Sequence, residues 1–78
     1  AYNLEVKYLQ NWIKSQWPEI VGNTIAQRTD KLFFKEDKLY VVVRSAALKQ
    51  QMHMSRTQIK ELVHQKAGRQ LVSEVVIL

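Results

Sequence analysis

Two short segments rich in aromatic and β-branched residues, Lys31 to Lys35 and Lys38 to Arg44, are separated only by Glu36 and Asp37. Two such runs joined by two residues are typical of a β-hairpin, and Asp tolerates the left-handed backbone that a tight turn needs. A two-residue turn fixes the register, since each strand residue then has one partner across the hairpin. The expected partners are Phe34 and Leu39, Leu32 and Val41, Phe33 and Tyr40, Lys35 and Lys38, and Lys31 and Val42.

This register gives the hairpin two unlike faces. One face is apolar and predicts a core, with Leu32, Phe34, Leu39, Val41 and Val43. The other is aromatic and basic, with Phe33 and Tyr40 among Lys31, Lys35, Lys38 and Arg44. Exposed aromatic rings among cations are typical of surfaces that stack unpaired nucleic-acid bases. Two simpler interpretations stay open: a helix covers this face, or the aromatic pair only stabilises the hairpin.

The rest of the chain predicts helices and one more strand. Apolar residues at helical spacing indicate a first helix from about Asn3 to Gln16. Pro18 suits the first turn of a second helix that reaches about Gln27, and Gly22 within it indicates a bend or a close packing partner. A long helix is expected from Ser45, its N-cap, to about Lys66, and Gly68 ends it. A closing strand from Leu71 to Leu78 could pair with either hairpin strand.

The order helix, helix, strand, strand, helix, strand predicts an α+β fold of two layers, a three-stranded sheet packed against helices. Without a repeat or a linker, residues 1–78 are expected to form a single domain, and Ala1 in place of Met fits a trimmed or processed start. No apolar run approaches the roughly 20 residues of a membrane-spanning helix. The absence of Cys excludes disulfides, thiolate zinc sites and thiol catalysis, and it is compatible with a reducing cytoplasm.

The net charge of +5 lies entirely in the second half of the chain. Residues 1–37 carry five basic and five acidic side chains, whereas residues 38–78 carry seven basic and two acidic ones. A localised positive field favours polyanionic partners. A basic charge that serves only solubility is the simpler interpretation.

One side of the long helix concentrates this charge. Lys49, His53, Arg56, Lys60 and His64 recur at spacings of four, three, four and four. Such a row could follow a nucleic-acid backbone, each cation meeting a separate phosphate. An ordinary solvated helix face is the competing interpretation, although such a face more often carries Glu–Lys pairs.

The sequence offers no catalytic or metal-binding set. His53 and His64 are eleven residues apart, about 16 Å along a helix, which is too far to share one ion. There is no Ser/His/Asp set, no pair of carboxylates and no Gly-rich phosphate loop. We therefore expect no enzyme activity, no metal and no cofactor. Trp17, at a helix junction before Pro18, is expected to be a packing anchor.

Two stretches of the chain form recognisable motifs: the run Trp17 to Gly22 with Ile25, Ala26 and Thr29, and then Leu39 to Val43 followed by Ser45 to Leu48. These motifs resemble those of the DciA-like family of bacterial proteins. The resemblance implies a KH-like domain in a cytoplasmic protein that acts on the replicative DNA helicase, helps load it on DNA and binds DNA. The chain departs from the family at Asp37, where Gly is frequent, and at Leu48, where an aromatic residue is frequent. It also lacks the GxxG loop with which KH domains clamp a nucleic-acid backbone.

Together these features predict a nucleic-acid-associated adaptor that assists helicase loading and binds single-stranded DNA. The residues expected to contact nucleic acid are Lys49, His53, Arg56 and Lys60, with Arg44, Lys35, Phe33 and Tyr40 as secondary candidates. One alternative is a protein-interaction module without a nucleic-acid role, docking through Tyr2, Tyr8 and Trp12 of the first helix. Another is an RNA-binding domain.

Overall fold

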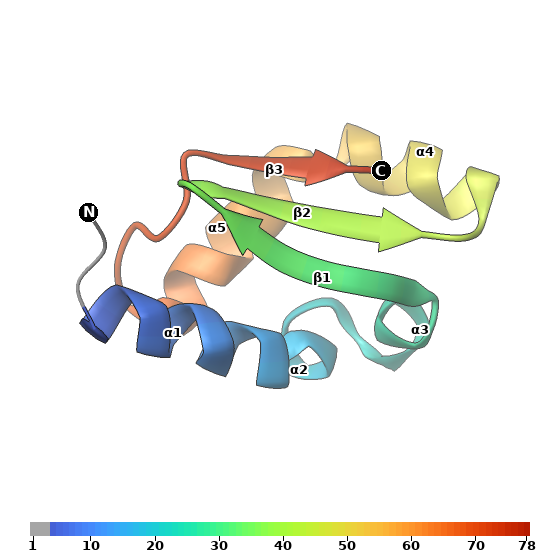
Figure 1. The fold of residues 1–78 in the computed structure, drawn as a ribbon. Coiled ribbons are helices and arrows are strands. Elements are labelled where there is room, and N and C mark those ends of the chain that lie inside the picture. Colours follow the sequence, from blue (N-terminus) through green and yellow to red (C-terminus); the bar gives the residue numbers. More distant parts are fainter. Residues whose placement is uncertain (1–3) are drawn as a thin grey trace.

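The structure, a computed structural model, describes residues 4–78 (Figure 1). The elements follow the order α1 (Leu4–Ser15), α2 (Trp17–Val21), α3 (Asn23–Gln27), β1 (Thr29–Lys35), β2 (Lys38–Val43), α4 (Ala46–Met54), α5 (Arg56–Ala67) and β3 (Glu74–Ile77). The α+β class and the expected order of helices and strands are confirmed, although two of the expected helices are each divided in two. Asn3, where the first helix was expected to begin, lies outside the described residues. The KH likeness stays a prediction from the family resemblance.

The three strands form one sheet in the order β1-β2-β3. β1 and β2 are antiparallel, and all five expected cross-strand pairs are confirmed, from Lys31–Val42 to Lys35–Lys38. The closing strand pairs with β2 and is parallel to it. Parallel neighbours need a long crossover connection, and α4 and α5 provide it. The closing strand is shorter than expected, because regular pairing covers only Glu74–Ile77.

The hairpin turn puts its left-handed residue at Glu36, with a φ of 57°. The sequence had suggested Asp37 for that role. A positive φ is uncommon for any residue that carries a Cβ. A residue with a Cβ in this conformation is strained by roughly 1–2 kcal/mol.

The second expected helix breaks at Gly22 into α2 and α3. Its φ of 93° and ψ of 157° are far from helical values. These angles confirm the expected bend. A Cβ placed on Gly22 would meet nothing within 4 Å, so the other interpretation, that Gly22 makes room for a close packing partner, is wrong. The glycine is needed there for its backbone conformation, which side chains rarely allow.

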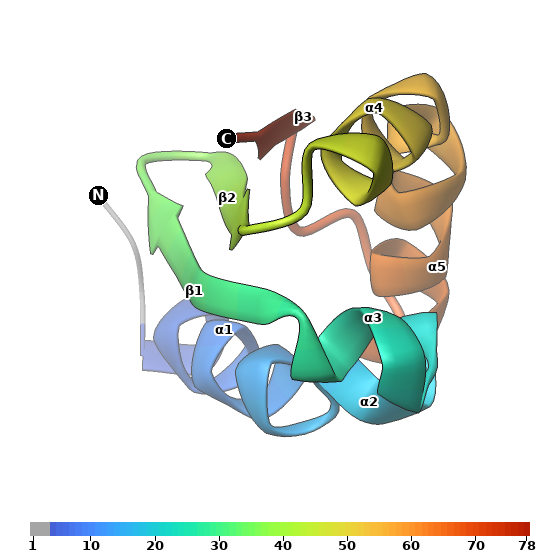
Figure 2. The same ribbon diagram turned by 90° about the vertical axis from the view of Figure 1, so that its right-hand side faces the viewer.

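The long helix expected from Ser45 to Lys66 was wrong as a single helix, because it breaks at Ser55. A straight helix over residues 46–67 would be about 33 Å long at 1.5 Å per residue, close to the 36 Å of the longest principal extent of the molecule. The break lets α4 lie beside β2 and β3 while α5 turns toward α1 and α2 (Figure 2). The start of α4 and the end of α5 are as expected from the sequence. The Ser45 side chain accepts from the Leu48 amide at 3.2 Å, and Gly68 ends α5 in the left-handed conformation.

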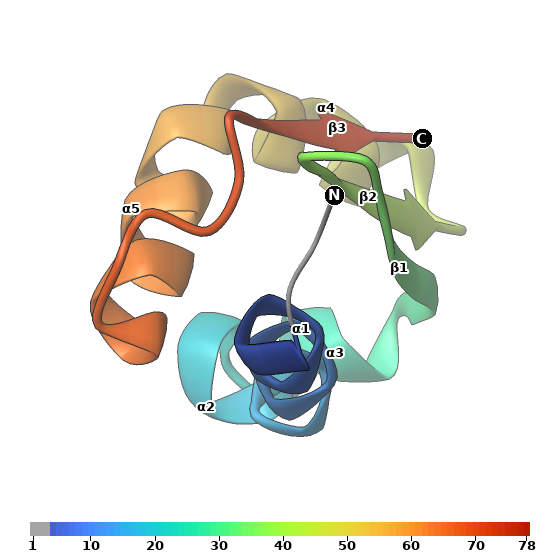
Figure 3. The same cartoon turned by 60° about the vertical axis from the view of Figure 1, so that its left-hand side comes forward.

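The core lies between the sheet and the helices (Figure 3). α1 and α3 pack against β1, α5 packs against β3, and α2 packs against α5. Trp17 is 4% exposed, and its Nε1 donates a hydrogen bond to Oγ1 of Thr29 at 3.1 Å, which confirms its role as a packing anchor. None of the helices within residues 4–78 has the length and apolar character needed to cross a membrane.

Candidate functional site

One face of the sheet is not covered by any helix within residues 4–78 (Figures 2 and 3). Along β2 the inward residues are all buried, whereas Lys38, Tyr40 and Val42 on the other side are all partly exposed. Strand pairing extends this outer side across the sheet. We call it the open sheet face, and it consists of Lys31, Phe33, Lys35, Lys38, Tyr40, Val42, Glu74 and Val76.

An aromatic pair lies at the centre of the open sheet face. The rings of Phe33 and Tyr40 are stacked, with centroids 5.0 Å apart and planes at 5°. Both residues are only partly buried, so the interpretation that a helix covers them is wrong. Each ring turns one face toward the other, and the opposite ring faces are not engaged in this stack. The pair therefore stabilises the hairpin and also offers aromatic surface.

The cations around this pair differ in their surroundings. Lys31 and Lys35 are exposed, and neither forms an ion pair within the described part of the chain. Lys38 lies across from Glu74, with Nζ 3.9 Å from Oε1. Beyond this face, Nε of Arg44 is 2.7 Å from Oδ1 of Asp30, in an ion pair that remains exposed to solvent. Lys31 and Lys35 are thus the cations best placed to meet an anion on the sheet.

The expected basic row on the long helix is divided by the break at Ser55. Lys49 and His53 lie exposed on α4, whereas Arg56 and Lys60 lie on α5. Arg56 connects the two helices, because its Nε donates to the His53 carbonyl at 3.0 Å. The structure therefore does not bring these four residues into one straight row.

His64, the fifth member of the row, has a structural environment instead. Its Nε2 lies 3.0 Å from the carbonyl oxygen of Val72 and 3.2 Å from the amide nitrogen of the same residue. The tautomer decides whether Nε2 donates to the first or accepts from the second. In either case His64 anchors the segment that leads into β3.

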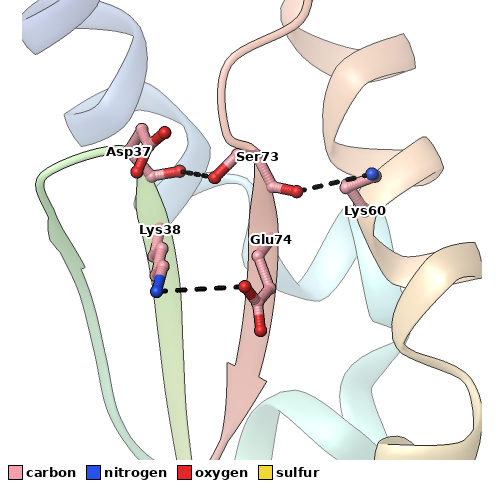
Figure 4. A network of polar contacts seen from close by, with 5 residues as sticks. All are labelled: Asp37, Lys38, Lys60, Ser73 and Glu74. Atoms are coloured by element: carbon pink, nitrogen blue, oxygen red, sulfur yellow. Dashed lines mark hydrogen bonds and ion pairs between the residues drawn. The ribbon is translucent and has the colours of Figure 1, made fainter.

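Arg56 and Lys60 line a groove of about 330 Å³ between α5 and the start of β3. We call it the α5–β3 groove. Nζ of Lys60 is 3.5 Å from the Ser73 carbonyl, and Oγ of Ser73 donates to the Asp37 carbonyl at 3.3 Å (Figure 4). The lining residues are Arg56, Thr57, Lys60, Ser73, Glu74 and Val75.

The α5–β3 groove and the open sheet face meet at Glu74, which belongs to both. Figure 4 shows Glu74 beside Lys38 on one side, with Lys60 reaching toward β3 from α5 on the other. Sequence reasoning missed Ser73 and Glu74. The sequence indicated only that they lie in the closing segment. Their place beside Lys38 becomes evident only when the strand is known to pair with β2.

Two apolar surfaces lie elsewhere. On α1, Leu4 is 86% exposed and Tyr8 is 67% exposed. Trp12 is partly buried, and Nζ of Lys66 lies 5.9 Å from its ring centroid. Tyr2, the third residue expected on this docking surface, lies outside the described residues. The second surface is a groove of about 210 Å³ where α2 and α3 meet α4 and α5, with Ile20, Val21 and Leu62 in its lining.

Residues 4–78 contain no group of three His, Asp or Glu side chains that could hold a metal ion. The cationic groups on the open sheet face and in the α5–β3 groove, together with the aromatic pair, suit an anionic ligand with planar rings. That combination is typical of single-stranded nucleic acid.

Comparison with known proteins gives two matches. The family model described as "Dna[CI] antecedent, DciA" matches residues 3–77. A "UPF0232 protein" of Corynebacterium glutamicum (strain R) is 33% identical over 66 residues, which are 85% of this chain and 37% of the relative. The chain thus spans well under half the length of that relative. No solved structure matches.

Proposed function

Because the chain belongs to the DciA family, we propose that it is a nucleic-acid-associated adaptor that helps load the replicative DNA helicase and binds single-stranded DNA. The family's description as an antecedent of DnaC and DnaI supports the association with helicase loading. The proposal involves no reaction and no cofactor. The helicase is the protein partner that the family membership implies.

The observation that carries the nucleic-acid part is the uncovered Phe33–Tyr40 stack beside Lys31 and Lys35. Unpaired bases stack on the free ring faces, which is worth about 1–3 kcal/mol per base. Phosphates of the same strand meet the neighbouring lysines and release counterions. A duplex would have its bases already stacked and paired, so this surface favours single strands.

The helix cations extend the same surface in two separate groups. Arg56 and Lys60 contact the strand at the α5–β3 groove, which borders the open sheet face at Glu74. Lys49 and His53 offer further contacts from the exposed side of α4. Arg44 contributes less than the unpaired lysines, because its Nε already faces Oδ1 of Asp30 at 2.7 Å.

The test is fluorescence anisotropy with a labelled oligothymidine, measured over a series of salt concentrations. Lys35→Gln is expected to weaken binding and to reduce the slope of log K against log salt by about 0.7, the value for one phosphate contact on a single strand. Lys7→Gln is the matched control, because Lys7 is an exposed lysine on α1. If the two variants show equal slopes, or if the parent does not bind at low salt, the nucleic-acid proposal is wrong.

A protein-interaction module without a nucleic-acid role is the second candidate function. The observation that favours it is the exposed apolar pair Leu4 and Tyr8 on α1. An apolar docking surface of this kind is nearly indifferent to salt, in contrast to phosphate binding. Titration of the helicase and of oligothymidine against the parent and Tyr8→Ser would identify it, since this function predicts that Tyr8→Ser weakens helicase binding and that the parent binds no oligonucleotide even at low salt. RNA in place of DNA is tested by exchanging oligothymidine for oligouridine.

A further inference from the structure

An acidic residue lies where the two basic surfaces meet. Glu74 is on the open sheet face and in the lining of the α5–β3 groove, with Arg56 and Lys60 on the other wall. Its side chain is 50% exposed. Its one ion pair within residues 4–78 is with Lys38, at 3.9 Å. A carboxylate at this position repels a phosphate. A nucleic-acid strand that crosses the groove therefore places a base, and not a phosphate, above Glu74.

The groove offers both hydrogen-bond acceptors and hydrogen-bond donors to a base. A carboxylate has about four lone-pair positions, and a contact at 3.9 Å is too long to be a hydrogen bond. On the opposite wall, Nε of Arg56 donates to the His53 carbonyl, so the two terminal amino groups of the guanidinium are the ones that can donate to a ligand. Lys60 makes one long contact of 3.5 Å with the Ser73 carbonyl, although its ammonium group has three donors.

Among the four bases of DNA, guanine matches this arrangement best. Its Watson–Crick edge carries two adjacent donors, N1–H and the N2 amino group, and these fit the two oxygens of one carboxylate. Its O6 and N7 are adjacent acceptors that Arg or Lys recognises. Thymine has a single donor between two carbonyl oxygens, and these oxygens repel a carboxylate. In a single strand the Watson–Crick edge is free to be recognised in this way.

We propose that the α5–β3 groove is a base-selective subsite that binds one guanine of a single strand, with Glu74 accepting from N1–H and N2 and with Arg56 or Lys60 donating to O6 and N7. The groove volume of about 330 Å³ is compatible with one base and is at the lower end of small-molecule sites. The inference rests on the proposed function, and it adds a sequence preference to a surface that otherwise recognises only backbone and stacking.

The experiment compares two oligonucleotides, an oligothymidine and the same oligomer with guanine at one central position. Affinities are measured by fluorescence anisotropy with the parent, Glu74→Ala and Glu61→Ala. Glu61 is an exposed acid of α5 outside the groove lining, so its substitution removes the same charge without touching the subsite. Thermal melting of each variant checks that it is folded, which is expected because Glu74 is half exposed at a strand end.

The parent is expected to bind the guanine oligomer about tenfold more tightly, within the range for one bidentate base contact. Glu74→Ala should abolish this preference, whereas Glu61→Ala should keep it. Equal affinity of the parent for the two oligomers overturns the subsite while leaving the proposed function intact. A preference that survives in Glu74→Ala also overturns it. If the parent binds neither oligomer, both the proposed function and this inference are wrong.

Discussion

The two faces of the sheet use similar side chains for different purposes. On β2 the inward residues Leu39, Val41 and Val43 are at most 4% exposed. On the same strand Tyr40 and Val42 point outward and remain partly exposed, although they are also apolar. The difference comes from the helices, which pack on one face only. Hydrophobic character alone therefore does not make a core, and an aromatic residue on the uncovered face is available to a ligand.

Charge sharpens the contrast between the faces. The buried residues within the described part of the chain are apolar except for Gln10, which carries no charge. The open sheet face carries three lysines and one glutamate around its aromatic pair. Burial of those charges would be costly without partners. Stability is thus concentrated on one face and binding capacity on the other, which implies that substitutions on the two faces should have separable effects.

The largest effect is expected for Leu39→Ala on the covered face. Leu39 is fully buried, and removal of its side chain should cost about 2–5 kcal/mol of unfolding free energy. That is a large share of the roughly 4–12 kcal/mol expected for a chain of this length. Urea denaturation measures the loss, with Val42→Ala from the open face as the control. Comparable losses in the two variants would show that the open face is also part of the core.

The second effect concerns ligand binding, and it compares two phenylalanines of β1. Phe33→Ala should weaken oligothymidine binding by about 1–3 kcal/mol, because one stacked base is lost. Phe34 is opposite Leu39 and packs against the buried cluster. Phe34→Ala should therefore lower stability more and change affinity less. Anisotropy and thermal melting of both variants give the two readouts, and a reversed order would contradict the assignment of the faces.

The smallest effect is expected at the turn that joins the two strands. Glu36→Gly relieves the strain of a φ of 57°. The relief is partly offset by the greater flexibility of Gly in the unfolded chain, so a net gain within about 1 kcal/mol is expected. Oligothymidine affinity should stay unchanged, since neither face is altered. A loss of stability in the melting curve would show that Glu36 has a favourable role that exceeds its backbone strain.

The sequence by itself determined the local features of this protein. The two residues between the strands fixed the hairpin register, and the register placed Phe33 beside Tyr40 as expected. Ser45 as a cap and Gly68 as a helix end were also identified correctly. Each of these depends on residues a few positions apart, for which turn geometry and backbone preference suffice.

Only the tertiary structure decided the features that depend on distant segments. Ser55 is the N-cap of α5, and Ser is typical of that position, but its side chain makes no cap hydrogen bond. This local signal is too weak to distinguish a break from a continuous helix, so packing decided that α4 and α5 separate. The choice of β2 as the partner of β3 follows from how the crossover helices pack. That choice brings Glu74 beside Lys38 and opposite Arg56, which lies 18 positions earlier in the chain. Packing of the apolar surfaces of whole elements determines these arrangements, and no short-range pattern encodes it.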